Sequence, residues 1–427
     1  MAKKTINKEL TGAQDLYNFL FEACNIIRGP VSQDNFKDYI TPLLYYKRIS
    51  DVYDEETEEA LISSGGDKEY ASLPEQHRFV IPDGCHWQEV RERTENLGAA
   101  IVGAMRQIEI ANPDTLYGVL SMFSSQKWTN KAILNDSKIR DLIEHLSKRK
   151  LGNKDYPADL MGDAYEILLK KFADDSKAQA GEFYTPRSVV RLLVHILDPQ
   201  PGETVYDPAC GSGGMLIEAI RYMHDDSLCC GSIFGQEKNV VNAAIAKMNL
   251  FLHGASDFNV MQGDTLRDPK ILQGGNIAKF DCVIANPPFS LENWGATEWS
   301  SDKYKRNIYG TPSDSCGDYA WIQHMICSMS SGKGRMAVVM PQGILFRGNQ
   351  EAEIRKQLVE SDLIEAVVTL GDKLFYGTGL SPCFLIIRRM KPAHHSGRIL
   401  MIDGSKILTQ KRAQNILEEN DIDRLYS

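Results

Sequence analysis

The sequence predicts an α/β protein of two domains, in which a helical N-terminal domain (residues 1–155) precedes a doubly wound, mainly parallel sheet covered by helices (residues 156–427). Three observations support this fold class. The 427 residues exceed the roughly 250–300 at which a single hydrophobic core stops growing. Apolar residues near the N-terminus recur at three- and four-residue spacings, which indicates helices. Farther along, short apolar runs alternate with helical stretches, as in sheets built from βαβ units.

Helical patterns dominate the N-terminal domain. The segments that show them are 15–29, 35–61, 95–110 and 138–148. Loops rich in Gly, Ser and Pro separate these segments, and KLGNKDYPADL (150–160) has the composition expected of a domain joint.

The second domain begins with a helical pattern at 162–175 and continues with strands and helices in alternation. The predicted strands are 203–209, 232–237, 258–264, 280–286, 335–341, 363–370 and 383–389. The predicted helices between them are 188–197, 214–224, 240–253, 320–330 and 349–360. Ligands of such sheets bind outside the carboxyl ends of the strands, so the residues that follow each strand are the candidates for chemistry.

Composition excludes several classes of protein. The nine cysteines contain no CxxC pair and the nine histidines no HExxH spacing, so neither a disulfide framework nor a metal site is predicted. No run of about 18 apolar residues occurs, and the start MAKKTINKEL lacks a signal-peptide core, so we expect a cytoplasmic protein without membrane association. The net charge of −9 lacks the basic excess of proteins that grip nucleic acid unaided.

A glycine-rich segment, DPACGSGG, follows the first predicted strand of the sheet. Its candidate ligand-binding residues are Asp207, Gly211, Ser212, Gly213 and Gly214. Glycines allow the backbone to approach a ligand closely, but the segment has neither the GK[ST] of a Walker loop nor GxGxxG. A carboxylate just before the glycines would repel a pyrophosphate and attract a cation, and an adenosyl ligand with an ammonium and a sulfonium group meets that requirement. A tight strand-to-helix turn is the alternative.

Acidic residues also follow the next two strands. Glu237 in FGQEKN stands where a dinucleotide-binding fold presents an acid to ribose hydroxyls. Asp264 in MQGDTL is an acceptor suited to an adenine amino group. The fourth strand ends in the tetrapeptide Asn286, Pro287, Pro288 and Phe289. Three acids at three successive strand ends, followed by NPPF, form a constellation that chance rarely produces.

This set resembles the S-adenosylmethionine-dependent amino methyltransferases of DNA. Within them, the order of EFYTPR (182–187), DPACGSGG and NPPF resembles the modification (methylation) subunit of type I restriction–modification systems, over most of the chain. The resemblance implies N6-adenine methylation with S-adenosylmethionine as cofactor. The cofactor segment precedes the catalytic motif, which is the gamma arrangement. Members of the family commonly continue into a C-terminal helical tail, whereas this chain stops at NDIDRLYS, and the difference bears on docking to a partner.

The family assigns roles to residues of this sequence by position. The segment implied to close over the methionine end of the cofactor consists of Glu182, Phe183, Tyr184, Thr185, Pro186 and Arg187. Within it, Thr185 is implied to contact the cofactor carboxylate. The glycine-rich segment is implied to flank the methionyl portion, Glu237 the ribose and Asp264 the adenine ring.

Partners are implied by the same resemblance. DNA is the expected substrate, its sequence read by a separate specificity subunit embraced by two methylation chains. Translocation and cleavage are expected from a third, restriction subunit, since this chain has no Walker motif. The N-terminal helices are expected to clamp DNA or to contact a partner.

The NPPF motif suits methylation of an exocyclic amine. The lone pair of adenine N6 is delocalised into the ring, and two acceptors that bind its hydrogens would expose that lone pair. The Asn286 side-chain oxygen and the Pro287 carbonyl are the expected acceptors, with the proline fixing the bend. Phe289 is expected to stack on the base. Because an adenine inside a duplex cannot reach such a pocket, it must flip out.

A segment that mixes aromatic and basic residues (292–321) follows the catalytic motif. Our hypothesis is that it orders over the flipped nucleotide or its phosphates, and the alternative is a mobile solvated loop. Its candidate side chains are Trp294, Trp299, Lys303, Lys305, Arg306 and Tyr309.

Three rival functions share parts of the pattern. Methylation of a protein glutamine uses a similar motif, which typically ends in tyrosine and lacks EFYTPR. Cytosine N4 methylation usually prefers serine at the position of Asn286. A non-catalytic S-adenosylmethionine-binding scaffold is a third reading, although a scaffold has no need for the acceptor pair.

Overall fold

The computed structural model describes residues 2–116, 118–120, 125–175, 185–223, 231–255, 257–375, 381–411 and 415–427. The chain forms two compact units. The first comprises residues 1–179 with 247–254, and the second comprises residues 180–246 with 255–427.

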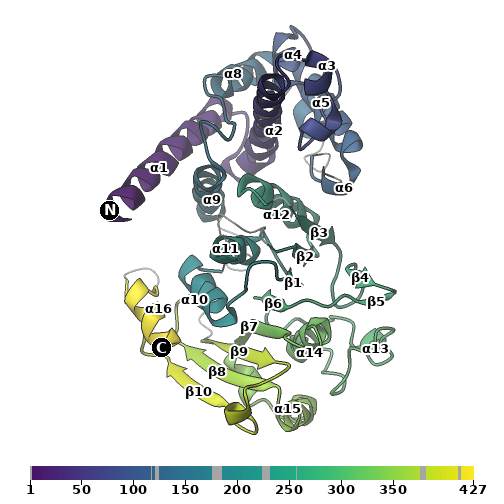
Figure 1. Ribbon diagram of the computed structural model, residues 1–427, viewed down its shortest axis with the longest axis vertical. Coiled ribbons are helices and arrows are strands. Elements are labelled where there is room, and N and C mark those ends of the chain that lie inside the picture. The colour runs from purple at the N-terminus through teal and green to yellow at the C-terminus, as the bar shows by residue number, and fades with distance from the viewer. Residues whose placement is uncertain are drawn as a thin grey trace. The chain divides into compact units, whose positions relative to one another are not determined.

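The first unit is helical (Figure 1). Its helices are α1 (Ala2–Ile27), α2 (Phe36–Ser63), α3 (Lys68–Ala71), α4 (Trp87–Glu92), α5 (Leu97–Ala111), α6 (Pro113–Leu116), α7 (Ser125–Thr129), α8 (Asp136–Leu146) and α9 (Ala158–Asp175), with 3-10 turns η1 (Gln33–Asn35) and η2 (Pro74–Gln76). The four predicted helices and the pattern at 162–175 are confirmed as α1, α2, α5, α8 and α9. Among the described helices, none combines the length and hydropathy needed to span a lipid bilayer.

The second unit is built on an eight-stranded sheet in the order β10-β8-β9-β7-β6-β1-β2-β3 (Figure 1). Its strands are β1 (Val205–Asp207), β2 (Ile233–Glu237), β3 (Phe258–Gln262), β6 (Cys282–Ala285), β7 (Arg335–Pro341), β8 (Ile364–Leu370), β9 (Pro382–Arg388) and β10 (Leu400–Gly404). All neighbours pair in parallel except β9, which runs antiparallel to both β7 and β8. The doubly wound, mainly parallel sheet is therefore confirmed.

Helices cover both faces of this sheet. The helices of the unit are α10 (Arg187–Leu197), α11 (Gly214–Met223), α13 (Ala296–Trp299), α14 (Asp318–Ser328), α15 (Gln350–Glu360) and α16 (Glu419–Tyr426), with 3-10 turns η3 (Gln342–Leu345) and η4 (Ala393–His395). Helix α12 (Val240–Leu252) begins in this unit, and its residues from 247 onward belong to the first. The face that includes Tyr206, Val283 and Met336 packs into one core with α14 and α15. Helices α10 and α11 contact the sheet as well, and α16 packs on α10. The central strands β1, β6 and β7 are buried throughout, as expected of strands covered on both faces.

Local sequence explains where α10 begins and ends. Pro186 stands at its N-cap, where a missing N–H costs nothing. The apolar residues of RSVVRLLVHIL recur at helical spacing and are buried. Asp198 then adopts a left-handed φ of 51°, and Pro199 cannot continue the helix. The helix thus places Thr185, two residues before it, beside the sheet.

Three strands are absent from the sequence prediction. The short pair β4 (Leu272–Gln273) and β5 (Asn276–Ile277) forms a separate antiparallel hairpin across a Gly-Gly turn. The strand β10 lies at an edge of the main sheet, and its residues are largely exposed. The strands β4 and β5 have two residues each, too few to show a pattern. The strand β10 does belong to an apolar run (399–402), which the prediction left unassigned.

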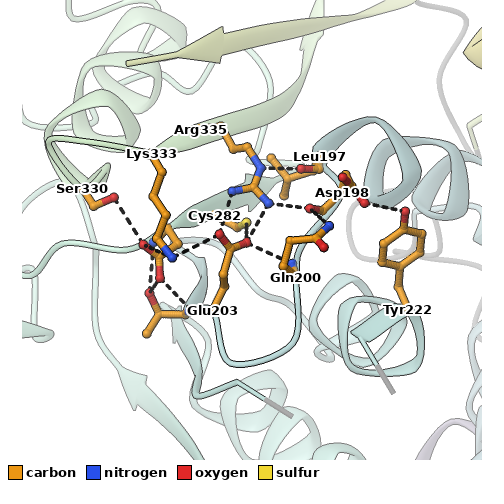
Figure 2. Close-up of polar contacts among 11 residues, drawn as sticks. Leu197, Asp198, Gln200, Glu203, Tyr222, Cys282, Ser330, Lys333 and Arg335 are labelled. Carbon is orange, nitrogen blue, oxygen red and sulfur yellow. Dashed lines mark hydrogen bonds and ion pairs between the residues drawn. The ribbon is translucent and has the colours of Figure 1, made fainter. Parts of the chain in front are cut away.

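A buried ion pair ties the amino ends of the central strands together (Figure 2). Arg335, the first residue of β7, donates to both carboxylate oxygens of Glu203 at 3.2 and 2.7 Å. It also donates to the carbonyl of Leu197 at 2.6 Å and to that of Asp198, at the end of α10. Burial raises the pKa of Glu203, but the hydrogen bonds from Arg335 and the Gln200 N–H outweigh it and lower the pKa to about 2.

We expect Glu203→Gln to destabilise the second unit by about 3 kcal/mol at pH 7, because the contacts of the folded state lower the pKa of the carboxyl from 4.5 to about 2. A group with a lowered folded-state pKa stabilises fully above its unfolded pKa of about 4.5 and loses that contribution as pH falls toward about 2. The difference between wild type and variant in the free energy of unfolding, measured with urea, should therefore become smaller from pH 5 to pH 3. The control Glu144→Gln removes a similar but solvent-exposed fork with Arg91 and should cost about 1 kcal/mol or less. A difference in the free energy of unfolding that stayed constant with pH for Glu203→Gln would contradict a stabilising role of the ionised carboxylate.

Candidate active site

The four motif-bearing strands lie side by side in the sheet. The order β6-β1-β2-β3 is parallel throughout, with Asp207 level with Gly235 and Glu237 level with Gln262. Carboxyl ends of parallel strands meet at one edge, so the residues after them share that edge. The structure therefore brings together the four predicted groups, Asp207, Glu237, Asp264 and Asn286, at the edge opposite the Arg335 ion pair.

The glycine-rich segment forms a tight turn between β1 and α11. Gly211 and Gly213 have φ values of 53° and 85°, a region that side-chain-bearing residues rarely adopt. The Gly213 N–H closes the turn on the carbonyl of Cys210 at 2.7 Å. The Gly211 N–H donates to the Glu237 carboxylate at 3.0 Å, and the Asn239 N–H donates to the same carboxylate at 2.7 Å. Glu237 thus braces the turn, a contact that the sequence did not indicate.

Asp207 and Glu237, at the carboxyl ends of β1 and β2, have no cationic partner among the described residues. Asp207 is 2% exposed, and burial, assisted by the nearby charge of Glu237, raises its pKa to about 8. Burial likewise raises the pKa of Glu237 above its ordinary value. No ion pair from the described residues reaches either group. A cationic ligand would offset the free-energy cost of burying the two ionised carboxylates. The site therefore has the charge expected of one that binds an ammonium or sulfonium group.

Asp264 lies in the loop after β3. Its carboxylate accepts the backbone N–H groups of Leu266 and Arg267 at 3.1 and 3.3 Å. Lys238, next to Glu237, pairs with it at 2.9 Å. The remaining lone pairs of the carboxylate can still accept a hydrogen bond from an amino group.

Asn286 directly follows the buried end of β6. Its Nδ2 donates to the Thr185 hydroxyl at 2.8 Å, which fixes the direction of the amide. Its Oδ1 is buried and has no hydrogen-bond partner among the described residues. A buried amide oxygen without a donor costs free energy, and such orphans mark places where a ligand or water donates. Pro287 is buried, Pro288 is exposed and Phe289 is half-buried.

The EFYTPR segment is described only in part. Glu182, Phe183 and Tyr184 lie outside the described residues. Thr185 reaches Asn286, a pairing across 101 residues that no sequence pattern signalled. Arg187 begins α10, and its half-exposed side chain lies 3.9 Å from Glu218 of α11.

The hypothesis for residues 292–321 is wrong for three of its six side chains. Trp294, Trp299 and Arg306 are almost fully buried. The Arg306 guanidinium stacks on Trp299 at 4.3 Å and donates to the carbonyls of Thr265 and Leu266 at 2.9 and 2.8 Å. These residues fasten the segment to the loop after β3, so they cannot reach DNA phosphates. Lys303 and Lys305 are exposed.

The loop after NPPF has a polar anchor that the sequence prediction missed. The Ser290 N–H donates to Asp318, whose other oxygen pairs with Arg347. Among the described residues, no group of three or more His, Cys, Asp or Glu side chains is arranged to hold a metal ion.

Two family models together match most of the chain. Residues 156–427 match the model described as N-6 DNA methylase, and residues 16–146 match the HsdM N-terminal domain. The chain belongs to the N-6 DNA methylase family. It is a methylation subunit of the type I restriction–modification kind, and its reaction is the S-adenosylmethionine-dependent methylation of adenine in DNA. The comparisons do not favour the glutamine, cytosine-N4 or scaffold alternatives.

Relatives of this N-6 DNA methylase agree with that assignment. The type I restriction enzyme MjaVII methylase subunit of Methanocaldococcus jannaschii is 34% identical over 404 residues, covering 90% of this chain and 67% of the relative. The EcoKI methylase subunit of Escherichia coli is 27% identical, covering 86% of this chain and 65% of the relative. A crystal structure of a type I methyltransferase subunit from Streptococcus thermophilus superposes with a TM-score of 0.80 at 26% identity, covering 97% of this chain and 92% of that one.

Proposed function

We propose that Asn286 Oδ1 and the Pro287 carbonyl accept the two hydrogens of adenine N6 in a flipped-out nucleotide. The observation that supports this role is the buried Asn286 Oδ1, which has no donor among the described residues. Hydrogen bonds in this pair draw the amine toward tetrahedral geometry and turn its lone pair outward. Phe289 is assigned to stack on the base, an interaction worth roughly 1–3 kcal/mol. The test is Asn286→Ala, with methyl transfer and cofactor binding measured separately.

The cofactor site that we propose lies along β1, β2 and β3. When bound, S-adenosylmethionine supplies an electrophilic methyl group on a sulfonium. The buried carboxylate of Asp207 and the turn from Gly211 to Gly214, which includes Ser212, hold the cationic methionyl end. Glu237 accepts from the ribose hydroxyls, and Asp264 accepts from the amino group of the cofactor's adenine ring. Glu237 has lone pairs to spare for this, since a carboxylate offers about four acceptor positions.

The segment from Glu182 to Arg187 is proposed to close over the methionine end of the cofactor. Thr185 is suited to a second task there. Its hydroxyl accepts from Asn286 Nδ2, and its own proton remains available for the cofactor carboxylate. One side chain would then link the cofactor to the catalytic amide. The methylated product needs no strong base, because an aromatic ammonium loses its proton readily to water.

Recognition of the DNA sequence is proposed to reside in a separate specificity subunit, embraced by two copies of this chain. The net charge of −9 supports this division, since unaided binding relies on Lys and Arg neutralising phosphates. Translocation and cleavage are assigned to a restriction subunit, and the helices of residues 1–155 to a DNA clamp or a partner contact. We place the complex in the cytoplasm because its substrate is DNA.

The isolated chain is expected to methylate DNA at least about 100-fold more slowly than the complex with its specificity subunit. A partner that holds DNA raises the effective concentration of the target, which typically gains a factor of about 10²–10⁴. The measurement is incorporation of labelled methyl groups into DNA carrying the mapped site, at equal concentrations of this chain with and without the partner. Strong, sequence-specific methylation by the chain alone would rule out the proposed division of labour.

A further inference from the structure

We propose that Asp318 is a positioning residue for methyl transfer. Together with Arg347 it forms a clamp that fixes the far end of the catalytic loop, residues 286–290, so that the acceptors of the loop face the adenine amine. This inference rests on the proposed function of Asn286 and Pro287.

The clamp begins at an unusual backbone position. Ser290 has a φ of 50°, in the left-handed region that is unfavourable for a residue with a side chain. Its N–H donates to Asp318 Oδ1 at 2.7 Å, and this bond holds the turn. The left-handed conformation of Ser290, directly after the NPPF motif, therefore depends on Asp318, which lies outside the loop.

The carboxylate that holds this turn is itself deeply buried. Asp318, the first residue of α14, is 0% exposed. Its second oxygen pairs with the Arg347 guanidinium, which also donates to Glu351 at 2.6 Å and to the Ser290 hydroxyl at 3.4 Å. A buried charge is tolerated only when it is paired and hydrogen-bonded, and replacement by apolar side chains often serves stability equally well. A fully buried carboxylate beside the catalytic loop, paired with a partly exposed Arg347, is therefore better explained by geometry than by stability.

The clamp joins loops from two neighbouring strands. Arg347 follows β7 through η3, and Ala285 at the end of β6 is level with Val338 of β7. Backbone bonds from the Gly317 N–H to the Leu291 carbonyl and from the Asn293 N–H to the Asp314 carbonyl extend the attachment. The two loops are thereby locked to α14.

The near end of the catalytic loop has its own anchor. Thr185 holds the Asn286 amide, so the loop is fixed at Asn286 and again at Ser290. Between these anchors lie the acceptors that we assign to the adenine amine. Reacting groups must be held to within about 0.5 Å, and a misplacement of about 1 Å can cost about 100-fold in rate. Loss of the Asp318 anchor frees one end of the loop and is expected to act on the rate of transfer rather than on cofactor binding.

The test compares Asp318→Ala and Asp318→Asn in the complex with the specificity subunit. Single-turnover methyl transfer is measured per bound cofactor, together with cofactor affinity by calorimetry and KM for DNA. We expect a rate about 100-fold lower for alanine and about tenfold lower for asparagine, which still accepts from the Ser290 N–H. Cofactor affinity and KM should change by about twofold or less. The control Glu365→Gln breaks a comparable pair with Arg388. That pair lies at the amino end of β8, away from the strand ends that carry the site, so the rate should be unchanged.

Every outcome separates the clamp from a purely structural role. A wild-type rate per bound cofactor in Asp318→Ala overturns the proposal. So does a weakening of cofactor affinity that is large enough to account for the whole loss of activity. Should neither Asp318 variant fold, Arg347→Lys replaces them, since it keeps the charge but loses the two-pronged contact, and a tenfold lower rate with unchanged cofactor binding is expected. Asn286→Ala is measured in parallel. An active Asn286→Ala overturns the proposed function, whereas an inactive one beside a fully active Asp318→Ala overturns the clamp alone.

Discussion

Asn286→Ala is expected to lower the rate of methyl transfer by about 10²–10³-fold, the usual loss when one preorganised hydrogen-bonding group of a transition state is removed. The variant removes the buried Oδ1 that has no partner among the described residues, and with it one of the two acceptors of the adenine amine. The amine would then keep its lone pair in the ring and remain a poor nucleophile. The measurement is single-turnover methyl transfer in the complex with the specificity subunit.

Cofactor affinity provides the internal control for this variant. Asn286 follows β6, whereas Asp207, Glu237 and Asp264 of the proposed cofactor site follow β1, β2 and β3. Thr185 only accepts from Asn286 and keeps its own proton for the cofactor, so affinity for S-adenosylmethionine should change little. The matched substitution Asn276→Ala, in the exposed β4–β5 hairpin, should leave both quantities at their wild-type values. A folded Asn286→Ala enzyme with undiminished transfer would show that the amide is not an acceptor in the reaction.

Asp207→Asn is expected to weaken the binding of S-adenosylmethionine by at least about 100-fold at pH 8 or above, where the carboxyl of the wild type is ionised. Removing one partner of a buried charge pair costs about 3–5 kcal/mol, and each 1.4 kcal/mol or so is a factor of ten in affinity. Asparagine matches the shape of aspartate, so the loss would report the charge. Calorimetric titration of the complex with the cofactor measures it, and Asp403→Asn on the edge strand β10 is the control.

The pH dependence of cofactor binding follows from the same group. Because burial raises the pKa of Asp207 to about 8, the carboxyl is largely protonated at pH 6 and must lose that proton to pair with a cation. Affinity should therefore rise with pH, by up to about tenfold per unit below pH 8, and level off above it. The ligand titrates equally in both proteins, so the difference between wild type and Asp207→Asn isolates Asp207. An identical slope for the two proteins would remove Asp207 from the cation site.

Much of the site could be predicted because it depends on local patterns. Buried parallel strands are apolar runs, and Asp207, Glu237 and Asn286 interrupt those runs where each strand ends. Parallel pairing then brings them to one edge regardless of the loops between them. The prediction needed only the alternation of apolar runs with helical stretches and the rule that ligands bind at the carboxyl ends of parallel strands.

The remaining features depend on contacts between distant residues. Thr185 and Asn286 are 101 residues apart, and Asp318 meets a serine 28 residues away. Arg306 and Trp299 show the limit of composition, because an exposed DNA-binding loop and a buried stacked pair use the same residue types. Only burial distinguishes them, and burial is a property of the folded chain. The assignment of domains at residues 155 and 156, and of individual cofactor contacts, stays a prediction.

The identity of the methylated nucleoside tests the central claim most directly. The complex with the specificity subunit is incubated with DNA and S-adenosylmethionine labelled in its methyl group, and the DNA is then digested to nucleosides. Label in N6-methyladenine with the wild-type chain, and its loss with Asn286→Ala, is the predicted result. Label in N4-methylcytosine, or in protein rather than DNA, would contradict a site in which Asn286 and Pro287 receive the amine of a flipped adenine.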